Sequence, residues 1–111
     1  MTELRDRRCR PMPPGTPALD PEQAAALLAR LAPGWRIAED GGSIRRPFGF
    51  ADFYETMAFV NAVAWIANAE DHHPDLEVGY NYCRMTFSTH TVGGLSENDF
   101  ICAAKVDALQ T

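Results

Sequence analysis

The segment from about residue 51 to residue 69 constrains the fold most, because its apolar residues lie on nearly every side of a predicted helix. Two adjacent stripes at helical spacing run along it, made of Phe53, Met57, Val60, Ala64 and Ala67 and of Phe59, Val63 and Ile66. A helix that is apolar nearly all round is buried on more than one side. We predict that one side faces a sheet and that another faces a second copy of the chain in a homo-oligomer.

A shorter helix and a pair of strands are predicted before this segment. Asp20 followed by Pro21 is typical of a helix start, and Pro33 with Gly34 ends that helix. Residues 35–39 and 43–48 read as two strands around a glycine-containing turn.

A second pair of strands and a last helix are predicted after it. Apolar residues alternate along residues 76–80 and 83–89, as in strands. Ser96, with Asp99 three residues on, predicts the start of the last helix. The predicted order is α-β-β-α-β-β-α, which is typical of an α+β two-layer domain with a four-stranded antiparallel sheet and helices packed on one face.

Composition separates a tail from one domain. Residues 1–17 hold several prolines and few large apolar side chains, which predicts a disordered or loosely held tail. Residues 18–111 form the predicted domain. The chain is 46% hydrophobic and 23% charged, as in ordinary globular proteins.

Charge and cysteine content limit the classes of binding partner and the cellular compartment that fit this chain. A net charge of -5 argues against a nucleic-acid partner. We expect no membrane partner, because the longest apolar run, residues 57–67, is too short to span a bilayer and the first residues do not resemble a signal peptide. The three cysteines have no Cys-x-x-Cys spacing, which fits a reduced, cytoplasmic protein.

All three histidines fall in two stretches of the chain. His72 and His73 follow the long predicted helix, and His90 is expected at the C-terminal end of a strand. Histidine has an unperturbed pKa of about 6.5, which permits proton exchange at cellular pH. We hypothesise that the three imidazoles converge on one cleft and act as acids and bases without a metal.

Plainer interpretations of the same residues stay open. Single histidines are often surface or core residues. Three histidines can also form an open zinc site, although two adjacent histidines rarely both reach one ion. Asp99 can serve only as a first-turn residue favoured by the helix macrodipole. Asp71 can be a solvated charge.

The two histidine stretches resemble the signature of the pterin-4a-carbinolamine dehydratases. The matching residues are 70–75, which read Glu-Asp-His-His-Pro-Asp, and then Thr89, His90, residues 94–96 and Asp99. Residues 46–53 and the pair Gly34 and Trp35 also match, so the resemblance covers about residues 20–108. One departure is Asn68, where members often carry an acidic residue or histidine. Asn68 can accept a hydrogen bond but cannot stabilise an imidazolium by charge.

The resemblance implies a fold, an assembly and a reaction. The implied fold is a four-stranded antiparallel sheet with helices on one face, in a homodimer or homotetramer built through residues 51–69. The implied reaction removes water from 4a-hydroxytetrahydropterin and gives quinonoid dihydropterin. Aromatic amino acid hydroxylases release this substrate, so the enzyme would be coupled to them and serve tetrahydropterin regeneration. No metal or other cofactor is implied, since the pterin is the substrate.

The resemblance also implies roles for individual residues. His72, His73 and His90 would be catalytic, with His73 and His90 moving protons to and from the hydroxyl group and His72 positioning the ring or acting as base. Asn68 and Asp99 would support them. The substrate-binding residues would be Asp71, His72, His73, Ser88, Thr89, His90 and Thr91.

A non-catalytic binding module is the alternative function. Animal members of the family also act as dimerisation cofactors of a homeodomain transcription factor, and some divergent members resemble assembly chaperones of a carbon-fixing enzyme. Those chaperone-like relatives tend to lose the His-His-Pro signature, which this chain keeps at residues 72–74. The signature therefore favours an enzyme over a binding module or a plain structural domain.

Overall fold

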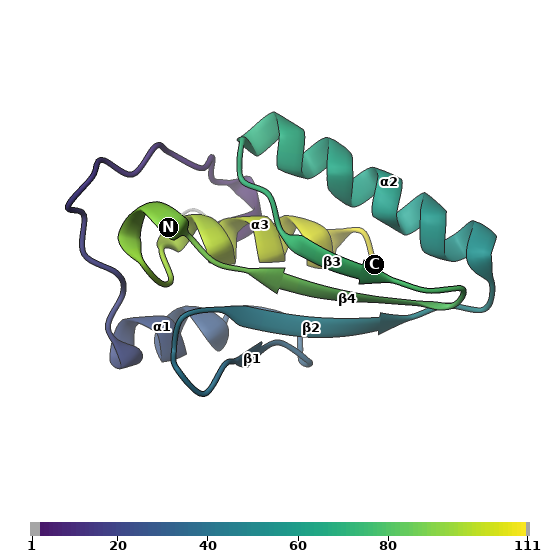
Figure 1. Cartoon of the computed structure of the whole chain (residues 1–111), viewed down its shortest axis with the longest axis horizontal. Coiled ribbons are helices and arrows are strands. Elements are labelled where there is room, and N and C mark those ends of the chain that lie inside the picture. Colours follow the sequence, from purple (N-terminus) through teal and green to yellow (C-terminus); the bar gives the residue numbers. More distant parts are fainter. Residues whose placement is uncertain (1–2, 111) are drawn as a thin grey trace.

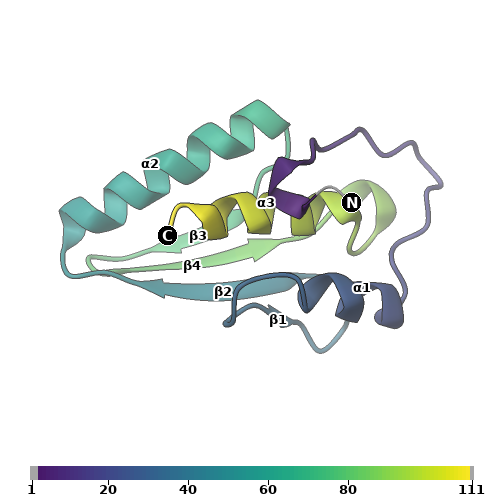
Figure 2. The ribbon, with the colours of Figure 1, turned by 180° about the vertical axis from the view of Figure 1, so that it is seen from behind.

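A computed structural model describes residues 3–110 of the chain and confirms the predicted α+β architecture. Strands pair antiparallel in the order β1-β2-β4-β3. Figure 2 shows α3 lying across one face of this sheet, with α2 and α1 on either side of it. The elements are η1 (Leu4–Asp6), α1 (Pro21–Leu28), β1 (Arg36–Ile37), β2 (Ile44–Gly49), α2 (Phe53–Glu70), β3 (Asp75–Val78), β4 (Tyr82–Phe87), η2 (His90–Val92) and α3 (Glu97–Ala108) (Figure 1).

Side-chain caps start α1 at Asp20, as predicted, and α2 at Asp52, which was not among the predicted caps. The Asp20 carboxylate accepts the Gln23 N–H at 2.8 Å, and the Gln23 side chain accepts the Asp20 N–H at 3.0 Å. At the start of α2, the Asp52 side chain accepts the Glu55 N–H at 2.9 Å. Each cap satisfies backbone donors that have no partner inside the helix.

The core lies between the sheet and α3. The largest fully buried side chains include Ile44 and Phe87 from the sheet and Phe100 from α3. Asp107 near the end of α3 accepts hydrogen bonds from the Trp35 indole and the Arg46 guanidinium. These contacts join the C-terminal end of α3 to β2 and to the residue before β1, and so fix that end of the helix against the sheet.

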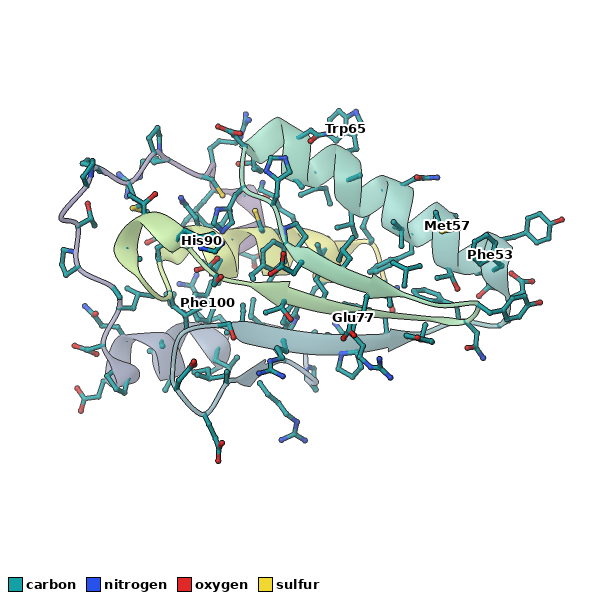
Figure 3. The ribbon with its side chains drawn as sticks, in the orientation of Figure 1. Phe53, Met57, Trp65, Glu77, His90 and Phe100 are labelled. Carbon is teal, nitrogen blue, oxygen red and sulfur yellow. The ribbon has the colours of Figure 1, made fainter. Side chains whose placement is uncertain are left out.

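Only one side of α2 is covered. Its buried residues, Thr56, Phe59, Val63 and Ala67, contain most of one predicted stripe. The other predicted stripe is only partly buried, and Phe53 is 48% exposed. Trp65 is 74% exposed and projects from α2 away from the sheet in Figure 3. A single chain therefore leaves an apolar helix face in water.

We predict that a second copy of the chain covers this face. Each large side chain buried in such an interface contributes roughly 1.5–3 kcal/mol. Sedimentation at micromolar concentration is expected to show a species of twice or four times the 12.3 kDa chain mass, and Trp65→Arg is expected to shift it towards the monomer. Sedimentation of the wild-type protein only as a monomer would contradict an interface on α2.

The expectation of a loosely held tail is corrected for the described part of residues 1–17. Leu4 is buried in the core, and η1 packs against α3. Arg7 forms a salt bridge with Glu97 at 3.1 Å. The composition argument missed this because one apolar side chain and a few polar contacts hold the segment. Residues 1 and 2, and residue 111 of the predicted domain, lie outside the described residues.

Two strand predictions are also corrected. β1 contains two residues in place of the five predicted at 35–39. The strand predicted at 83–89 ends at Phe87, and His90 begins the 3₁₀ turn η2. Within residues 3–110, no helix combines the length and the apolar character that crossing a bilayer requires.

Candidate active site

The end of α2 places His72 against the sheet. Asp71 caps the helix in the left-handed conformation, with φ 53° and ψ 43°, which aspartate tolerates better than most residues. The backbone N–H groups of Asp71 and His72 both donate to the Ala67 carbonyl. The chain then turns sharply, and the His72 ring stacks parallel to Phe87 with centroids 6.0 Å apart.

Asp99 links His72 to two other segments from a fully buried position. Its Oδ1 lies 2.6 Å from His72 Nε2. Its Oδ2 accepts the Thr89 hydroxyl at 2.8 Å and the Ser96 N–H at 3.0 Å. The carboxylate thus caps α3, as predicted, and also holds the turn after β4 and the loop after α2. The interpretation of Asp99 as a cap alone does not describe these contacts.

The partners of Asp99 fix the tautomer of His72. An ionised carboxylate only accepts hydrogen bonds, so Nε2 of His72 carries the hydrogen. In the neutral ring, Nδ1 is then the nitrogen with a free lone pair. A buried carboxylate that orients an imidazole in this way also stabilises the imidazolium that forms when the other nitrogen takes a proton.

A hollow of about 380 Å³ opens beside this pair. Four parts of the chain line it: the end of α2, the turn after β4, the first turn of α3, and the N-terminal segment. Four predicted site residues, Asp71, His72, Thr89 and Thr91, are among the lining residues. A larger, more open depression of about 580 Å³ beside the first half of α2 contains none of the predicted site residues, so residue chemistry and not size points to the hollow of His72.

His73 takes a separate position on the surface. Its Nε2 lies 3.0 Å from the Asn68 amide oxygen, and both residues are exposed. Asn68 therefore contacts the imidazole of His73, to which it offers an uncharged hydrogen-bond acceptor. His73 does not line the hollow of His72.

His90 lies in a neighbouring hollow. Thr89 pairs with Gly94, donating its N–H to the Gly94 carbonyl at 2.8 Å, and this closes the turn. Gly93, with φ 68°, supplies the left-handed conformation that the turn needs. His90 then lines a second hollow of about 380 Å³ together with Ser88 and Thr89. Figure 3 shows His90 beyond the end of β4.

The three imidazoles do not line a single hollow in this chain. His72 and His90 line different hollows, and His73 is exposed on the surface. Thr89 lines both hollows, so they adjoin at this residue. The prediction placed His90 at the C-terminal end of a strand, and the Thr89–Gly94 pairing turns the chain at that point.

Other residues of the site were not anticipated from the sequence. Asn98 and residues 9–12 line the hollow of His72, and Phe87 supports the His72 ring. The alternation of β4 could have indicated Phe87 as an inward-facing residue. No pattern in the sequence indicates Asn98 or the N-terminal residues. Within residues 3–110, no three His, Cys, Asp or Glu side chains are grouped so as to hold a metal ion.

The fold and the site together define a class of small α+β proteins that hold a histidine–carboxylate pair beside a hollow suited to a small ligand. The chain matches the family model described as pterin 4 alpha carbinolamine dehydratase over residues 17–109. The chain belongs to this family.

Sequence relatives agree with the family match. The chain is 57% identical over 107 residues to a Nitrosomonas eutropha protein provisionally named pterin-4-alpha-carbinolamine dehydratase, covering 96% of this chain and 93% of the relative. A Legionella pneumophila (strain Corby) protein with the same provisional name is 56% identical over 108 residues, covering 97% of this chain and 96% of the relative.

Solved structures agree as well. A transcriptional coactivator/pterin dehydratase from Brucella melitensis is similar with a TM-score of 0.80 at 31% identity, covering 85% of this chain and 99% of that one. A pterin dehydratase-like protein described as a RuBisCO assembly factor in the alpha-carboxysome is similar with a TM-score of 0.60 at 28% identity, covering 68% of this chain and 88% of that one.

Proposed function

We propose that the chain dehydrates 4a-hydroxytetrahydropterin to quinonoid dihydropterin and water by histidine acid–base catalysis. One observation carries this proposal: in a member of the pterin dehydratase family, a buried carboxylate orients His72 beside a hollow. The hollow, at about 380 Å³, lies within the range of small-molecule sites, roughly 300–1,000 Å³.

The reaction needs an acid and a base. The bond between ring carbon 4a and its hydroxyl oxygen breaks, and hydroxide leaves poorly unless it is protonated. A proton leaves the adjacent ring nitrogen, and its electrons complete a carbon–nitrogen double bond. Positioned proton transfers of this kind typically contribute roughly 10²–10⁴-fold to the rate. The products are the quinonoid pterin and one water molecule, so electrons and atoms balance without an oxidant.

The positions of the histidines suggest how they divide this work. His72 is the base or ring-positioning residue, with Nδ1 free to take a proton and Asp99 stabilising the resulting charge. His73 and His90 transfer protons to and from the hydroxyl group. For His72 and His90 to act together, the substrate must lie across Thr89, where the two hollows adjoin. His73 lines neither hollow, so its exposed ring must turn towards the bound substrate.

Polar residues at the hollows suit the edges of a pterin. The exposed Asp71 carboxylate at the mouth can accept hydrogen bonds from the amino and N–H groups of the pyrimidinone ring. Thr91 and Ser88 offer hydroxyl groups on the two sides. The Thr89 hydroxyl already donates to Asp99, so we propose that Thr89 positions Asp99 and contacts the substrate only by packing.

The proposal extends to the cellular role. The reaction requires no metal or redox cofactor, because every step is a proton transfer or a bond cleavage that leaves the oxidation state unchanged. Functional coupling to an aromatic amino acid hydroxylase would supply the substrate and place the enzyme in tetrahydropterin regeneration, in the cytoplasm.

A stopped assay of carbinolamine dehydration with purified protein tests the proposal. We expect the protein to accelerate the reaction and EDTA to leave the rate unchanged, since histidines supply both the acid and the base. An unchanged background rate would contradict dehydration. Loss of rate with EDTA that added zinc restores would favour the zinc interpretation of the histidines.

The exposed face of α2 favours a second candidate function, as a binding module. The similar structures include a transcriptional coactivator and an assembly factor, and Phe53 and Trp65 are exposed on this chain. Trp65→Arg separates the two functions. An effect confined to partner binding, with normal dehydration, would support the binding role.

A further inference from the structure

The N-terminal segment forms one wall of the His72 hollow. Residues 9–12 contribute Cys9, Arg10, Pro11 and Met12 to its lining. Figure 2 shows the beginning of the chain between the C-terminal end of α2 and the first half of α3. These two helix ends also carry His72 and Asp99, so the segment covers the same part of the molecule that holds the histidine–carboxylate pair.

Asn98 holds this wall through the backbone of Arg10. The Arg10 N–H donates to Asn98 Oδ1 at 3.1 Å, and Asn98 Nδ2 donates to the Arg10 carbonyl at 2.7 Å. Both backbone polar groups of Arg10 are therefore satisfied by one amide side chain. Asn98 is buried and precedes Asp99 directly, which links the wall to the residue that orients His72.

Glu70 is the second anchor. Its Oε1 accepts the Cys9 N–H at 2.8 Å, and its Oε2 accepts Arg8 Nε at 2.8 Å. Burial alone would raise the pKa of Glu70, but the Cys9 hydrogen bond and the charges of Lys105 and Arg8 outweigh burial and lower it below 4.5. Above pH 4.5 the ionised Glu70 carboxylate therefore stabilises the packed N-terminal segment. This stabilisation is lost as the pH falls through the lowered pKa of Glu70.

We propose that residues 9–12 are part of the substrate-binding site and that Glu70 and Asn98 are the positioning residues that hold them against it. The proposal rests on the proposed function. It adds to the substrate-binding site a wall made of residues 9–12, which belong to none of the motifs in the sequence. Pro11 and Met12 offer apolar surface to one face of a flat heterocycle, and thioether groups make favourable contacts with aromatic rings. The wall also keeps bulk water from the His72–Asp99 pair.

Kinetics distinguish a binding wall from a catalytic group. A wall contacts substrate and transition state alike, so its loss raises KM and leaves kcat nearly unchanged. Asn98→Ala removes two hydrogen bonds and is expected to raise KM by about tenfold. Met12→Ala, which keeps both anchors, is expected to raise KM by about threefold with kcat unchanged.

Glu97→Gln is the matched control. Glu97 neighbours Asn98 and pairs with Arg7, but it does not line the hollow. The Arg7–Glu97 pair is partly exposed, and such pairs contribute little to stability, so Leu4, Glu70 and Asn98 are expected to keep the segment in place. KM is therefore expected to stay at the wild-type value. Unchanged KM in both Asn98→Ala and Met12→Ala would overturn the proposal, and so would a KM increase in Glu97→Gln as large as in Asn98→Ala.

A cross-link tests the position of the wall independently of any activity. The Sγ atoms of Cys9 and Cys102 lie 3.5 Å apart, and a disulfide requires about 2.05 Å. A diazene oxidant such as diamide takes one hydrogen from each thiol, becoming the hydrazine as the disulfide forms. Cys102 is fully buried and Cys9 is only partly buried, so Cys9 is the thiol that diamide reaches first.

The expected product has a mass about 2 Da lower, which dithiothreitol reverses, with Cys83 still free. Asn98→Ala is expected to form the cross-link more slowly, because the segment is less firmly held. Failure of the wild-type protein to form the cross-link would overturn the proposal that residues 9–12 form this wall.

Binding measurements separate this proposal from the proposed function. If the protein shows no dehydration, the Kd for a 7,8-dihydropterin replaces KM for the same three variants. Weaker binding by Asn98→Ala and Met12→Ala, but not by Glu97→Gln, would then support the wall without the reaction. Equal binding by all three variants, or no binding by the wild-type protein, would overturn it.

Discussion

The His73→Ala variant is expected to retain its fold and to lose at least a factor of ten, and up to about 10⁴, in kcat for carbinolamine dehydration. The loss follows from the proposed proton transfer to the leaving hydroxyl group. The fold is expected to survive because His73 is exposed and its ring bonds to the equally exposed Asn68. The stopped assay and a thermal melt of the same preparation measure both effects.

Asn68→Ala is the matched control for this variant. It removes the hydrogen-bond partner of His73 but keeps the imidazole, so the fall in kcat is expected to be smaller than in His73→Ala. A wild-type kcat in His73→Ala would exclude His73 from the chemistry and leave His72 and His90 as the proton carriers. An equal loss in both variants would mean that the orientation given by Asn68 matters as much as the ring.

Asp99→Ala is expected to destabilise the protein by about 3–5 kcal/mol, as for removal of one partner from a buried charged network. Asp99 is fully buried, and its removal leaves the Thr89 hydroxyl, the Ser96 N–H and His72 Nε2 without their acceptor. Dehydration by the fraction that stays folded is expected to fall as well, because His72 loses its orientation. Urea denaturation and the stopped assay give the two values.

Asp99→Asn and Glu97→Gln make this test specific. A residue that is only a helix cap contributes about 1 kcal/mol, so a loss of that size with normal activity would reduce Asp99 to a cap. The Asp99→Asn change keeps the size of the side chain, but it replaces one acceptor oxygen with an NH₂ group. This NH₂ group must face at least one of the hydrogen-bond donors that now surround the carboxylate. We therefore expect Asp99→Asn to lose both stability and activity and Glu97→Gln, on the same first turn, to lose neither.

The long helix illustrates what local sequence determines. Its start at Phe53 and its end at Glu70 lie within two residues of the predicted 51–69. The Asp52 cap and Pro74 bound it, and both act through neighbouring residues. The prediction that one side would lack a partner within the chain also follows from the residues alone, since the apolar stripes are wider than one sheet contact.

The site depends on contacts that local patterns do not contain. His72 and Asp99 are 27 residues apart, and their pairing requires α3 to lie against the sheet at one position. The family resemblance supplied both residues, but the carboxylate's simultaneous bonds to Thr89 and Ser96 appear only in three dimensions. The packed N-terminal segment was missed for a related reason, because backbone groups of residues 9 and 10 bind side chains of Glu70 and Asn98.

Thr89 lines both hollows and donates its hydroxyl to Asp99. Anyone who redesigns this protein for another heterocycle will find that the two halves of the site cannot be tuned separately at this position. A bulkier residue without a hydroxyl group at position 89 would narrow both hollows at once. It would also remove the hydrogen bond that Thr89 donates to Asp99. Engineering for altered substrates should therefore begin at positions 88 and 91, which each belong to one compartment, and leave position 89 unchanged.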